Sequence, residues 1–355
     1  YTEQVIPRSQ ATREMKRRQA GLILHEIAHM WFGDLVTMAW WNDLWLNESF
    51  ATYMAGLALE RAAGFPEAWL EFTAETKLHA YTQDDMITTH PIEMDLHRVK
   101  EVRSNFDGIT YNKGASVLKQ LVYFIGEDSF RKGLKDYFQK HQFQNTVRAD
   151  FIAALQPHTA KDLKTWAERW LQQSGVDTIA VQWKCEGPQL PMLRIEQIPL
   201  KGTKFRPQAG EVALYSNQSG KVTRTQSLHV DLLKPGPIEI SGPWPCPNMI
   251  YPNDKDYGYA HVQLDPLSLE FLKGHLSNFP APDIRALLWN DLWQMTRDAK
   301  MSLREYSEIA FQQFPLEKDS TLQDQVISTL GPWRGSVLRF WPQETDEVRK
   351  AYRVH

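Results

Sequence analysis

The sequence predicts a multidomain α+β protein in which a helical N-terminal half is followed by a small β-sandwich and then by a second helical region. The chain has 355 residues, enough for two or three domains. Patterns of helical period run up to Ser174-Gly175, patterns of period two extend from Ile179 to about Leu264, and helical patterns return at Asp265. We therefore expect domains at residues 1–176, 177–265 and 266–355.

Composition and charge exclude several classes of protein. The chain is 42% hydrophobic and 23% charged, as expected for an ordered globular protein. Its net charge of -3, without a basic stripe, argues against a nucleic-acid partner. No window holds 18 consecutive apolar residues, and the first residues lack a signal-peptide pattern. We expect a soluble, cytoplasmic monomer with no membrane segment.

The two cysteines, Cys185 and Cys246, have neither the spacing of a metal site nor the number of a disulfide framework. Disulfides are rare in reducing compartments. We therefore expect two unpaired thiols.

The N-terminal residues predict two helices that form an antiparallel pair. After an extended stretch over residues 1–11 with a break at Pro7, Thr12 is a good N-cap for a helix that runs to about Trp31. Residues 35–41 suit a short strand or buried connection. Asn42-Asp43 can cap a second helix, which we expect to end near Ala63 before Gly64-Phe65-Pro66.

The remaining elements follow from the same patterns. Residues 82–107 are polar and predict no strand, and short runs at 193–198, 211–215 and 222–230 predict strands of the sandwich. Less clear helical patterns continue to His355. Further helices are expected at 67–80, 113–126, 128–141, 148–156, 161–173, 267–277, 282–298, 302–313 and 320–330.

The first helix carries the sequence His25-Glu26-Ile27-Ala28-His29, an H-E-x-x-H motif. Positions i and i+4 share one face of a helix, so the two imidazoles can converge on one ion while Glu26 projects beside it. Zinc accepts imidazole and carboxylate ligands, and Glu48 on the next helix is well placed to be the third. With 11 histidines in the chain, a residue four after a histidine is His only about 3% of the time, so two core histidines are the weaker explanation.

A zinc ion at this place gives Glu26 a chemical role. Its carboxylate can take a proton from a metal-bound water that attacks a carbonyl and then pass the proton to the leaving amine. The developing oxyanion needs a further donor across the site.

These residues resemble the zinc aminopeptidases of the M1 family, the aminopeptidase N class. The resemblance rests on the H-E-x-x-H motif, the gap of 18 residues and the block Trp45-Leu46-Asn47-Glu48-Ser49-Phe50-Ala51. The blocks at 89–92 and 109–115 follow in the same order. The resemblance implies the helical half of a thermolysin-like zinc peptidase domain, one Zn²⁺ held by His25, His29 and Glu48, and Glu26 as general base. It also implies removal of N-terminal residues from peptide substrates.

The same resemblance makes Tyr111 the oxyanion donor, although without it a tyrosine there is more simply a packing residue. We expect Lys113 to be a solvated residue at a helix start and His90 to fix a loop by hydrogen bonds. Each metal-binding imidazole needs an orienting partner, for which Asp34, Asp43 and Asn47 are candidates. We assign no role in metal binding to the histidines at 79, 97, 141, 158, 229, 261, 275 and 355.

The chain departs from the family pattern because it has no G-x-M-E-N block before the zinc helix. In the family that block supplies the glutamate that binds the free amino group of the substrate. We therefore expect an internal fragment whose C-terminal helical domain is cut short, with little specific activity by itself and apolar surface exposed on its helices. A zinc endopeptidase or an epoxide-opening relative of the same fold stays an alternative, as does a peptide-binding scaffold with a vestigial site.

Overall fold

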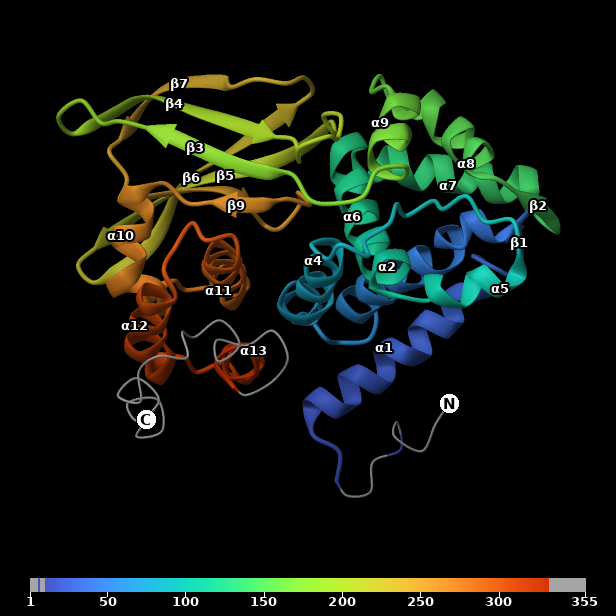
Figure 1. Ribbon diagram of the computed structural model, residues 1–355, viewed down its shortest axis with the longest axis horizontal. Coiled ribbons are helices and arrows are strands. Elements are labelled where there is room, and N and C mark those ends of the chain that lie inside the picture. The colour runs from blue at the N-terminus through green and yellow to red at the C-terminus, as the bar shows by residue number, and fades with distance from the viewer. Residues whose placement is uncertain (1–5, 7–9, 332–355) are drawn as a thin grey trace.

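A computed structural model describes residue 6 and residues 10–331 of the chain. Within that part the N-terminal region is mostly helical, the middle region is a two-sheet sandwich, and the last region is helical again (Figure 1). The expected extended stretch before Gln10 and the expected helical patterns after Gly331 lie outside the described residues, apart from Ile6.

The helical region is built around α1 (Arg13–His29) and α2 (Trp45–Arg61). Thr12 caps α1 as expected, because its hydroxyl accepts a hydrogen bond from the Met15 amide at 3.2 Å. The contacts pair Gly21 with Leu59, and His25 with Thr52, so residue numbers rise along one helix as they fall along the other. The predicted antiparallel pair is confirmed.

The predicted cap of the second helix is wrong. Residues Trp41–Asp43 form a 3₁₀ turn, and neither Asn42 nor Asp43 caps α2. The Asp43 carboxylate instead accepts hydrogen bonds from the indole of Trp45 at 3.1 Å and from the amide of Arg148 at 3.2 Å. The Asp43 carboxylate is therefore bound by the indole of Trp45 and the amide of Arg148, and it does not accept from the amides at the start of α2.

The remaining helical region surrounds this pair with short helices. The expected helix at 67–80 is interrupted by one π-helix, and a second π-helix precedes α6. Residues 82–107 contain no strand, as expected. The elements are β1 (Val36–Met38), α3 (Ala68–Glu71), a π-helix (Phe72–Lys77), α4 (Leu78–Asp84), α5 (Val99–Val102), a 3₁₀ turn (Arg103–Asn105), a π-helix (Ile109–Lys113), α6 (Gly114–Ile125), α7 (Glu127–His141), β2 (Gln144–Thr146), α8 (Arg148–Leu155), a 3₁₀ turn (Gln156–His158) and α9 (Leu163–Trp170).

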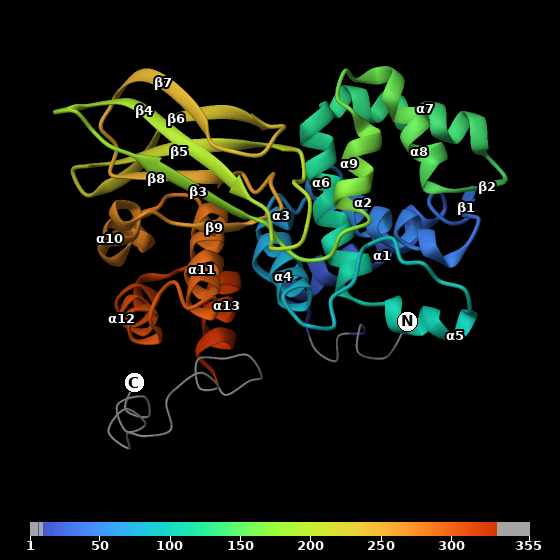
Figure 2. The same ribbon diagram turned by 45° about the horizontal axis from the view of Figure 1, so that its top comes forward.

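The sandwich packs a four-stranded sheet, in the order β7-β4-β3-β9, against a three-stranded sheet, in the order β6-β5-β8 (Figure 2). Alternate residues of the facing strands form its core, which includes Val181, Leu193, Val212 and Ile250. The predicted sandwich is confirmed. The strands are β3 (Thr178–Trp183), β4 (Gln189–Ile198), β5 (Gln208–Gln218), β6 (Lys221–Leu232), β7 (Ile238–Pro245), β8 (Met249–Asp254) and β9 (His261–Gln263).

The expectation of two unpaired thiols is wrong, because Cys185 and Cys246 form a disulfide. They are separated by 61 positions, but antiparallel pairing of β4 with β7 places Gln189 opposite Pro245 and so brings the two cysteines together. The expectation of free thiols rested on the rarity of disulfides in reducing compartments, and that argument does not hold for this pair.

The C-terminal helices pack on the outer face of the three-stranded sheet. Tyr215, Met249 and Tyr251 of that sheet share one core with Leu288 and Tyr306 of the helices. Four predicted helices are confirmed with ends within two residues of those expected. They are α10 (Pro266–His275), α11 (Pro282–Arg297), α12 (Leu303–Gln313) and α13 (Ser320–Leu330), with 3₁₀ turns at Leu276–Asn278 and Phe314–Leu316.

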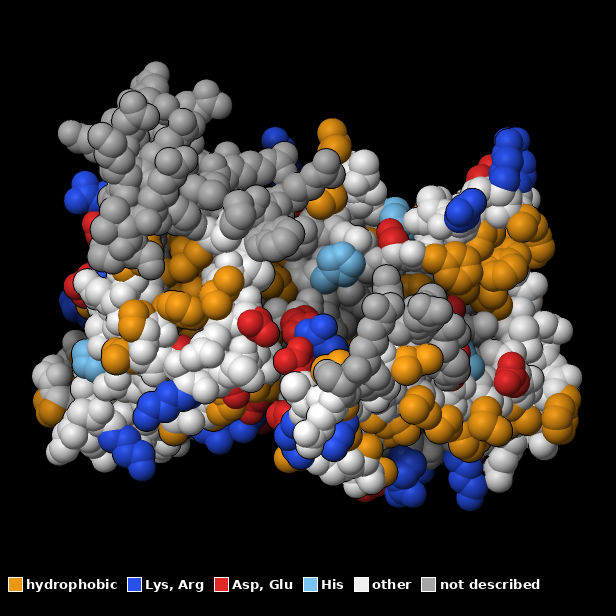
Figure 3. Space-filling model, turned by 90° about the horizontal axis from the view of Figure 1, so that it is seen from below, with side chains coloured by type: hydrophobic (Ala, Val, Ile, Leu, Met, Phe, Trp, Pro, Cys, Tyr) orange, Lys and Arg blue, Asp and Glu red, His pale blue; other side chains and the backbone are white. Residues whose placement is uncertain are grey.

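Apolar side chains lie exposed on the helical region, where Figure 3 shows them gathered on one face. On α1 and just after it, Ile23, Ile27, Met30 and Trp31 are each more than two-fifths exposed. Their positions follow one face of the helix, opposite the face that packs on α2. None of the described helices has the length and apolarity needed to cross a membrane.

Candidate metal centre

The predicted ligands meet where α1 packs against α2. The His25 Nε2 lies 3.1 Å from the His29 Nε2 and 3.2 Å from the Glu48 Oε2, and the His29 Nε2 lies 3.3 Å from the same oxygen. Within the described residues, this is the one group of three metal-ligating side chains whose donor atoms all lie within 4.8 Å of one another. Helical spacing explains the two histidines, and antiparallel packing brings Glu48 to them.

The donor set fits zinc. Ligand atoms about 2.0–2.2 Å from a tetrahedral ion lie about 3.3–3.6 Å apart, close to the three separations found here. Two imidazoles and one carboxylate leave a fourth position free, as catalytic zinc sites do. The side chains need to move apart only slightly to accept the ion.

The charge distribution favours an anionic Glu48 between the two histidines. Burial alone would raise the pKa of Glu48, but hydrogen bonds from His25, His29 and the Tyr111 hydroxyl outweigh it and lower that pKa to about 2. The hydrogen bond to Glu48 raises the pKa of His29. Glu48 therefore stays ionised at neutral pH and can act as a metal ligand.

The orienting partners of the histidines are not those expected. The His29 Nδ1 lies 2.9 Å from the Phe32 carbonyl oxygen, and the His25 Nδ1 lies 3.4 Å from the Thr52 hydroxyl. In the described structure none of the three candidates Asp34, Asp43 and Asn47 bonds to either imidazole. Thr52 was detectable, because it lies four residues after Glu48 on the same face of α2. A backbone carbonyl leaves no such signal.

Glu26 and Tyr111 face the same cavity as His25. Both line a cavity of about 500 Å³ together with His25 and Thr52. The rings of Tyr111 and His25 are stacked with centroids 6.0 Å apart. Burial, followed by the charge of Glu48, raises the pKa of Tyr111 above its usual range. The phenol is therefore protonated at neutral pH and can donate a hydrogen bond.

A second cavity of about 550 Å³ borders the ligands at Glu48. Its walls include the aromatic side chains of Trp40, Trp41 and Phe106. The predicted ligands therefore border two cavities, one at His25 and one at Glu48.

The prediction for Lys113 is wrong. Its side chain is fully buried and its Nζ lies 2.7 Å from the Asp84 carboxylate. Asp84 also accepts hydrogen bonds from the Thr89 hydroxyl and the Gly175 amide. Lys113 thus anchors the π-helix that carries Tyr111, and no residue near it in the sequence indicates this partner.

The prediction for His90 is confirmed. Its Nδ1 lies 2.8 Å from the Pro91 carbonyl oxygen and its Nε2 lies 2.8 Å from the Asp107 carboxylate. The other Asp107 oxygen accepts from the amides of Ile109 and Thr110. His90 therefore orients the residue that caps the start of the π-helix.

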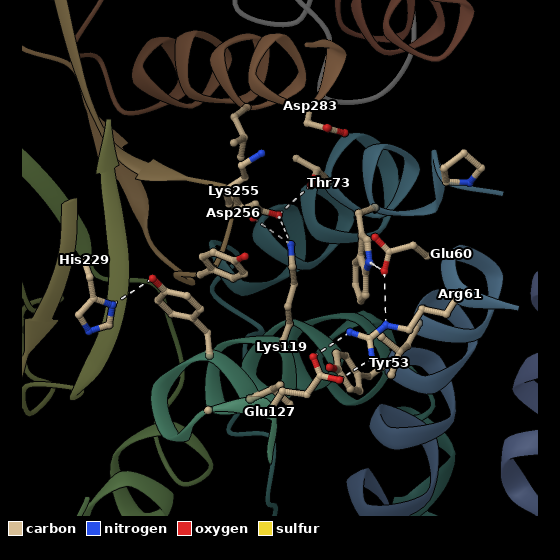
Figure 4. A pocket seen from close by; sticks show the side chains of 18 residues that line it. Tyr53, Glu60, Arg61, Thr73, Lys119, Glu127, His229, Lys255, Asp256 and Asp283 are labelled. Atoms are coloured by element: carbon tan, nitrogen blue, oxygen red, sulfur yellow. Dashed lines mark hydrogen bonds and ion pairs between the residues drawn. The ribbon is translucent and has the colours of Figure 1, made fainter. Parts of the chain in front are cut away.

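A further cavity, of about 660 Å³, lies elsewhere, between the helical region, the sandwich and α11. Figure 4 shows Thr73 and Lys119 directed at Asp256 within it, and none of the five predicted site residues lines it. Several of its charged groups pair with one another, as Arg61 does with Glu127 and Lys119 with Asp256. The cavity belongs to the junction of the three regions rather than to the metal centre.

Two known domains match the chain. Residues 2–170 match the Peptidase family M1 domain, and residues 249–354 match the ERAP1-like C-terminal domain. The first match contains every predicted site residue. The second contains β8, β9 and the C-terminal helices, so the chain is a multidomain α+β protein.

Relatives match nearly the whole chain. Aminopeptidase N of Streptomyces lividans is 39% identical over 97% of this chain and 42% of its own length. Tricorn protease-interacting factor F2 of Thermoplasma volcanium is 30% identical over 89% of this chain and 38% of its own length. Probable aminopeptidase 2 of Sulfurisphaera tokodaii is 30% identical over 96% of this chain and 41% of its own length. The chain thus spans about two-fifths of each relative.

An H-E-x-x-H motif on one helix, with a glutamate from the next helix beside it, is an arrangement typical of metallopeptidases. The domain match and the relatives make the family specific. The chain belongs to the M1 peptidase family.

Proposed function

We propose that the protein containing this chain is a zinc-dependent aminopeptidase. The observation that carries the proposal is the convergence of His25, His29 and Glu48 within 3.3 Å, beside a cavity lined by Glu26 and Tyr111. The names of two relatives, aminopeptidase N and probable aminopeptidase 2, support removal of N-terminal residues. We infer that the helical region is the helical half of a thermolysin-like zinc peptidase domain.

The three ligands would hold one zinc ion per chain. When bound, zinc supplies Lewis-acid polarisation of a carbonyl and makes a water acidic near neutral pH. The backbone carbonyl of Phe32 and the hydroxyl of Thr52 keep the ligating nitrogens of His29 and His25 turned toward Glu48. The ligand set is thus oriented before the ion arrives.

Glu26 would act as the general base. Its carboxylate lies on the ligand helix, one position after His25, and faces the cavity rather than the protein interior. It can accept a proton from the attacking water and deliver that proton to the amine that leaves. The Glu26 carboxylate returns to its ionised form at the end of the cycle.

Tyr111 would stabilise the oxyanion. Its hydroxyl is protonated at neutral pH, because burial and the nearby Glu48 raise its pKa. A neutral donor placed before the reaction needs no reorganisation when negative charge develops on the substrate oxygen. We expect its hydrogen bond to strengthen in the transition state.

The expected partners are peptides, and the absence of a nucleic-acid partner stays a prediction from the sequence. We expect the two cavities that border the ligands to hold side chains on either side of a scissile bond. A monomeric state and a cytoplasmic location stay predictions from the sequence.

Matched peptide substrates test the proposal in the whole protein. A peptide with a free amino terminus should lose its first residue, whereas the same peptide carrying an N-acetyl group should resist. Equal cleavage of both would favour the endopeptidase alternative. Turnover of an epoxide alone would favour the epoxide-opening relative, and tight binding without cleavage would favour the scaffold.

A further inference from the structure

A fully buried serine links the two halves of the proposed centre. Ser49 directly follows Glu48 on α2, and its hydroxyl donates a hydrogen bond of 2.6 Å to the carbonyl oxygen of Thr110. Thr110 directly precedes Tyr111 in the π-helix. One short bond therefore joins the residue beside a predicted metal ligand to the residue beside the predicted oxyanion donor.

The glycine at the start of α6 makes this close approach possible. A Cβ placed on Gly114 would lie 1.9 Å from the Ser49 Oγ and 2.7 Å from its Cβ, far inside contact distance. The backbone angle of Gly114, φ -57°, is ordinary for a helix, so conformation does not require glycine here. The contact with Ser49 is therefore the reason that position 114 has no side chain.

The π-helix is also held at both ends. At its start, the Gly108 amide donates to the Gln83 side chain at 2.8 Å, and Asp107 accepts from the two amides that follow Gly108. At its end, Lys113 pairs with Asp84 in the interior. The Ser49 bond adds a lateral tie to α2, the helix that carries Glu48.

We propose that Ser49 is a positioning residue that fixes the distance between Tyr111 and the metal ligand Glu48, with Gly114 providing the space. Ser49 is 0% exposed and so cannot touch a substrate. Its bond uses a backbone carbonyl, and it therefore persists whichever groups Glu48 and the Tyr111 hydroxyl contact during the cycle. This inference rests on the proposed peptidase function.

Loss of the bond should act through Tyr111. Without the Ser49 hydroxyl, the π-helix can shift relative to α2, and displacements near 1 Å in catalytic groups can reduce rates by about 100-fold. Since Tyr111 is proposed to act in the transition state, the change should appear in kcat rather than in KM.

The experiment is a double-mutant cycle in the whole protein with a free-amine peptide substrate. S49A should lower kcat by about 10-fold with KM and bound zinc unchanged, but in a Y111F background it should lower kcat by less than about 2-fold. S116A is the matched control, because the buried Ser116 hydroxyl also donates to a π-helix carbonyl, that of Asn112 at 2.8 Å, without reaching α2. S116A should keep nearly full kcat.

Moving the side chain from position 49 to position 114 separates the effect of packing from the effect of the hydrogen bond. G114A should lower the melting temperature strongly, because its methyl group collides with Ser49. S49G/G114A removes the collision and should recover the melting temperature, while its kcat stays as low as that of S49G. Recovery of full kcat by S49G/G114A would overturn the positioning role and leave only packing.

The outcomes distinguish this inference from the proposed function. Three results would each overturn the positioning role while the peptidase function stands. The first is full kcat in S49A, and the second is an equal loss of kcat in S49A and S116A. The third is that S49A lowers kcat by the same factor in the wild-type and Y111F backgrounds. A wild-type protein that binds zinc but cleaves no peptide would overturn the proposed function itself.

Discussion

At the scale of single residues, the site depends on two side chains that face the same cavity as His25. Glu26 and Tyr111 reach it from α1 and from the π-helix, respectively. Neither is among the three predicted metal ligands, so each can be changed with the ligand set left in place.

E26Q should lower kcat by about 10² to 10⁴-fold, since the amide keeps the shape of the side chain but cannot take a proton. Metal content measured on the same sample should be unchanged. E14Q is the control, because Glu14 lies on the same helix but is not among the residues that line the cavity. An E26Q protein with wild-type turnover would exclude Glu26 as the base.

Y111F should lower kcat by about 10² to 10³-fold with a small change in KM, as expected when a transition-state donor is removed. Steady-state kinetics on one peptide measure both constants. A large rise in KM with kcat preserved would instead assign Tyr111 to ground-state binding.

Residues whose partners lie nearby in the sequence were the predictable ones. His25 and His29 share a helical face, and Glu48 lies in the first turn of the next helix. Their spacing in the sequence was therefore enough to predict that the three side chains converge. Lys113 was mispredicted because its partner Asp84 lies 29 positions earlier and meets it only after folding. The contacts of His29 with the Phe32 carbonyl and of Ser49 with the Thr110 carbonyl involve backbone atoms that no residue type marks.

At the scale of elements, the long helices and the sandwich followed from periodicity, as α11 and α13 show. The π-helices did not, because segments of 6 and 5 residues are too short for the apolar pattern to show a wider turn. The second π-helix carries Tyr111 and is locked at its end by the pair of Lys113 with Asp84. Burial would raise the pKa of Asp84, but pairing with Lys113 outweighs it and lowers that pKa.

K113M should destabilise the folded protein by about 3–5 kcal/mol, because it leaves the Asp84 carboxylate buried without a counter-charge. Chemical denaturation measures the loss. The double variant D84N/K113M removes both charges and should recover part of it. K132M, at an exposed position on α7, should be neutral, and a K113M protein as stable as K132M would show that the pair contributes nothing.

At the scale of the whole molecule, charged clusters join the three regions. Asp256 of the loop after β8 pairs with Lys77 and Lys119 of the helical region. A second cluster brings Asp85 of the helical region to His261 of β9 and Arg297 of α11. These contacts couple regions that the sequence predicted separately.

The second cluster predicts a pH dependence. Burial raises the pKa of Asp85 to about 7, although Arg297 partly opposes this. The folded protein thus binds this proton more tightly than the unfolded chain. The resulting stabilisation is present at low pH and is lost as pH rises from about 4 to about 7.

The D85N side chain does not titrate, so only the wild type loses that stabilisation as the pH rises. The melting temperature of D85N minus that of the wild type should therefore increase by about 2 °C or more from pH 5 to pH 8. The other titrating groups of the cluster, His261 and Asp298, are present in both proteins and largely cancel in the difference. D128N, at an exposed position, should show no such trend. A difference that is constant or decreasing over this range would refute the raised pKa.

The disulfide between Cys185 and Cys246 is also a property of the whole fold. It depends on pairing between β4 and β7, two strands that are not consecutive in the chain. Composition could indicate that two cysteines are present but not that the sheet brings them together, and for that reason the sequence prediction failed here.

The central claim is that His25, His29 and Glu48 hold the one zinc ion on which peptide cleavage depends. The most direct measurement removes metal from the whole protein with a chelator and then titrates zinc back while zinc content and peptidase activity are followed together. Activity should disappear with the metal and return in proportion to zinc, reaching its maximum at one ion per chain. Full activity in the metal-free protein would contradict the claim.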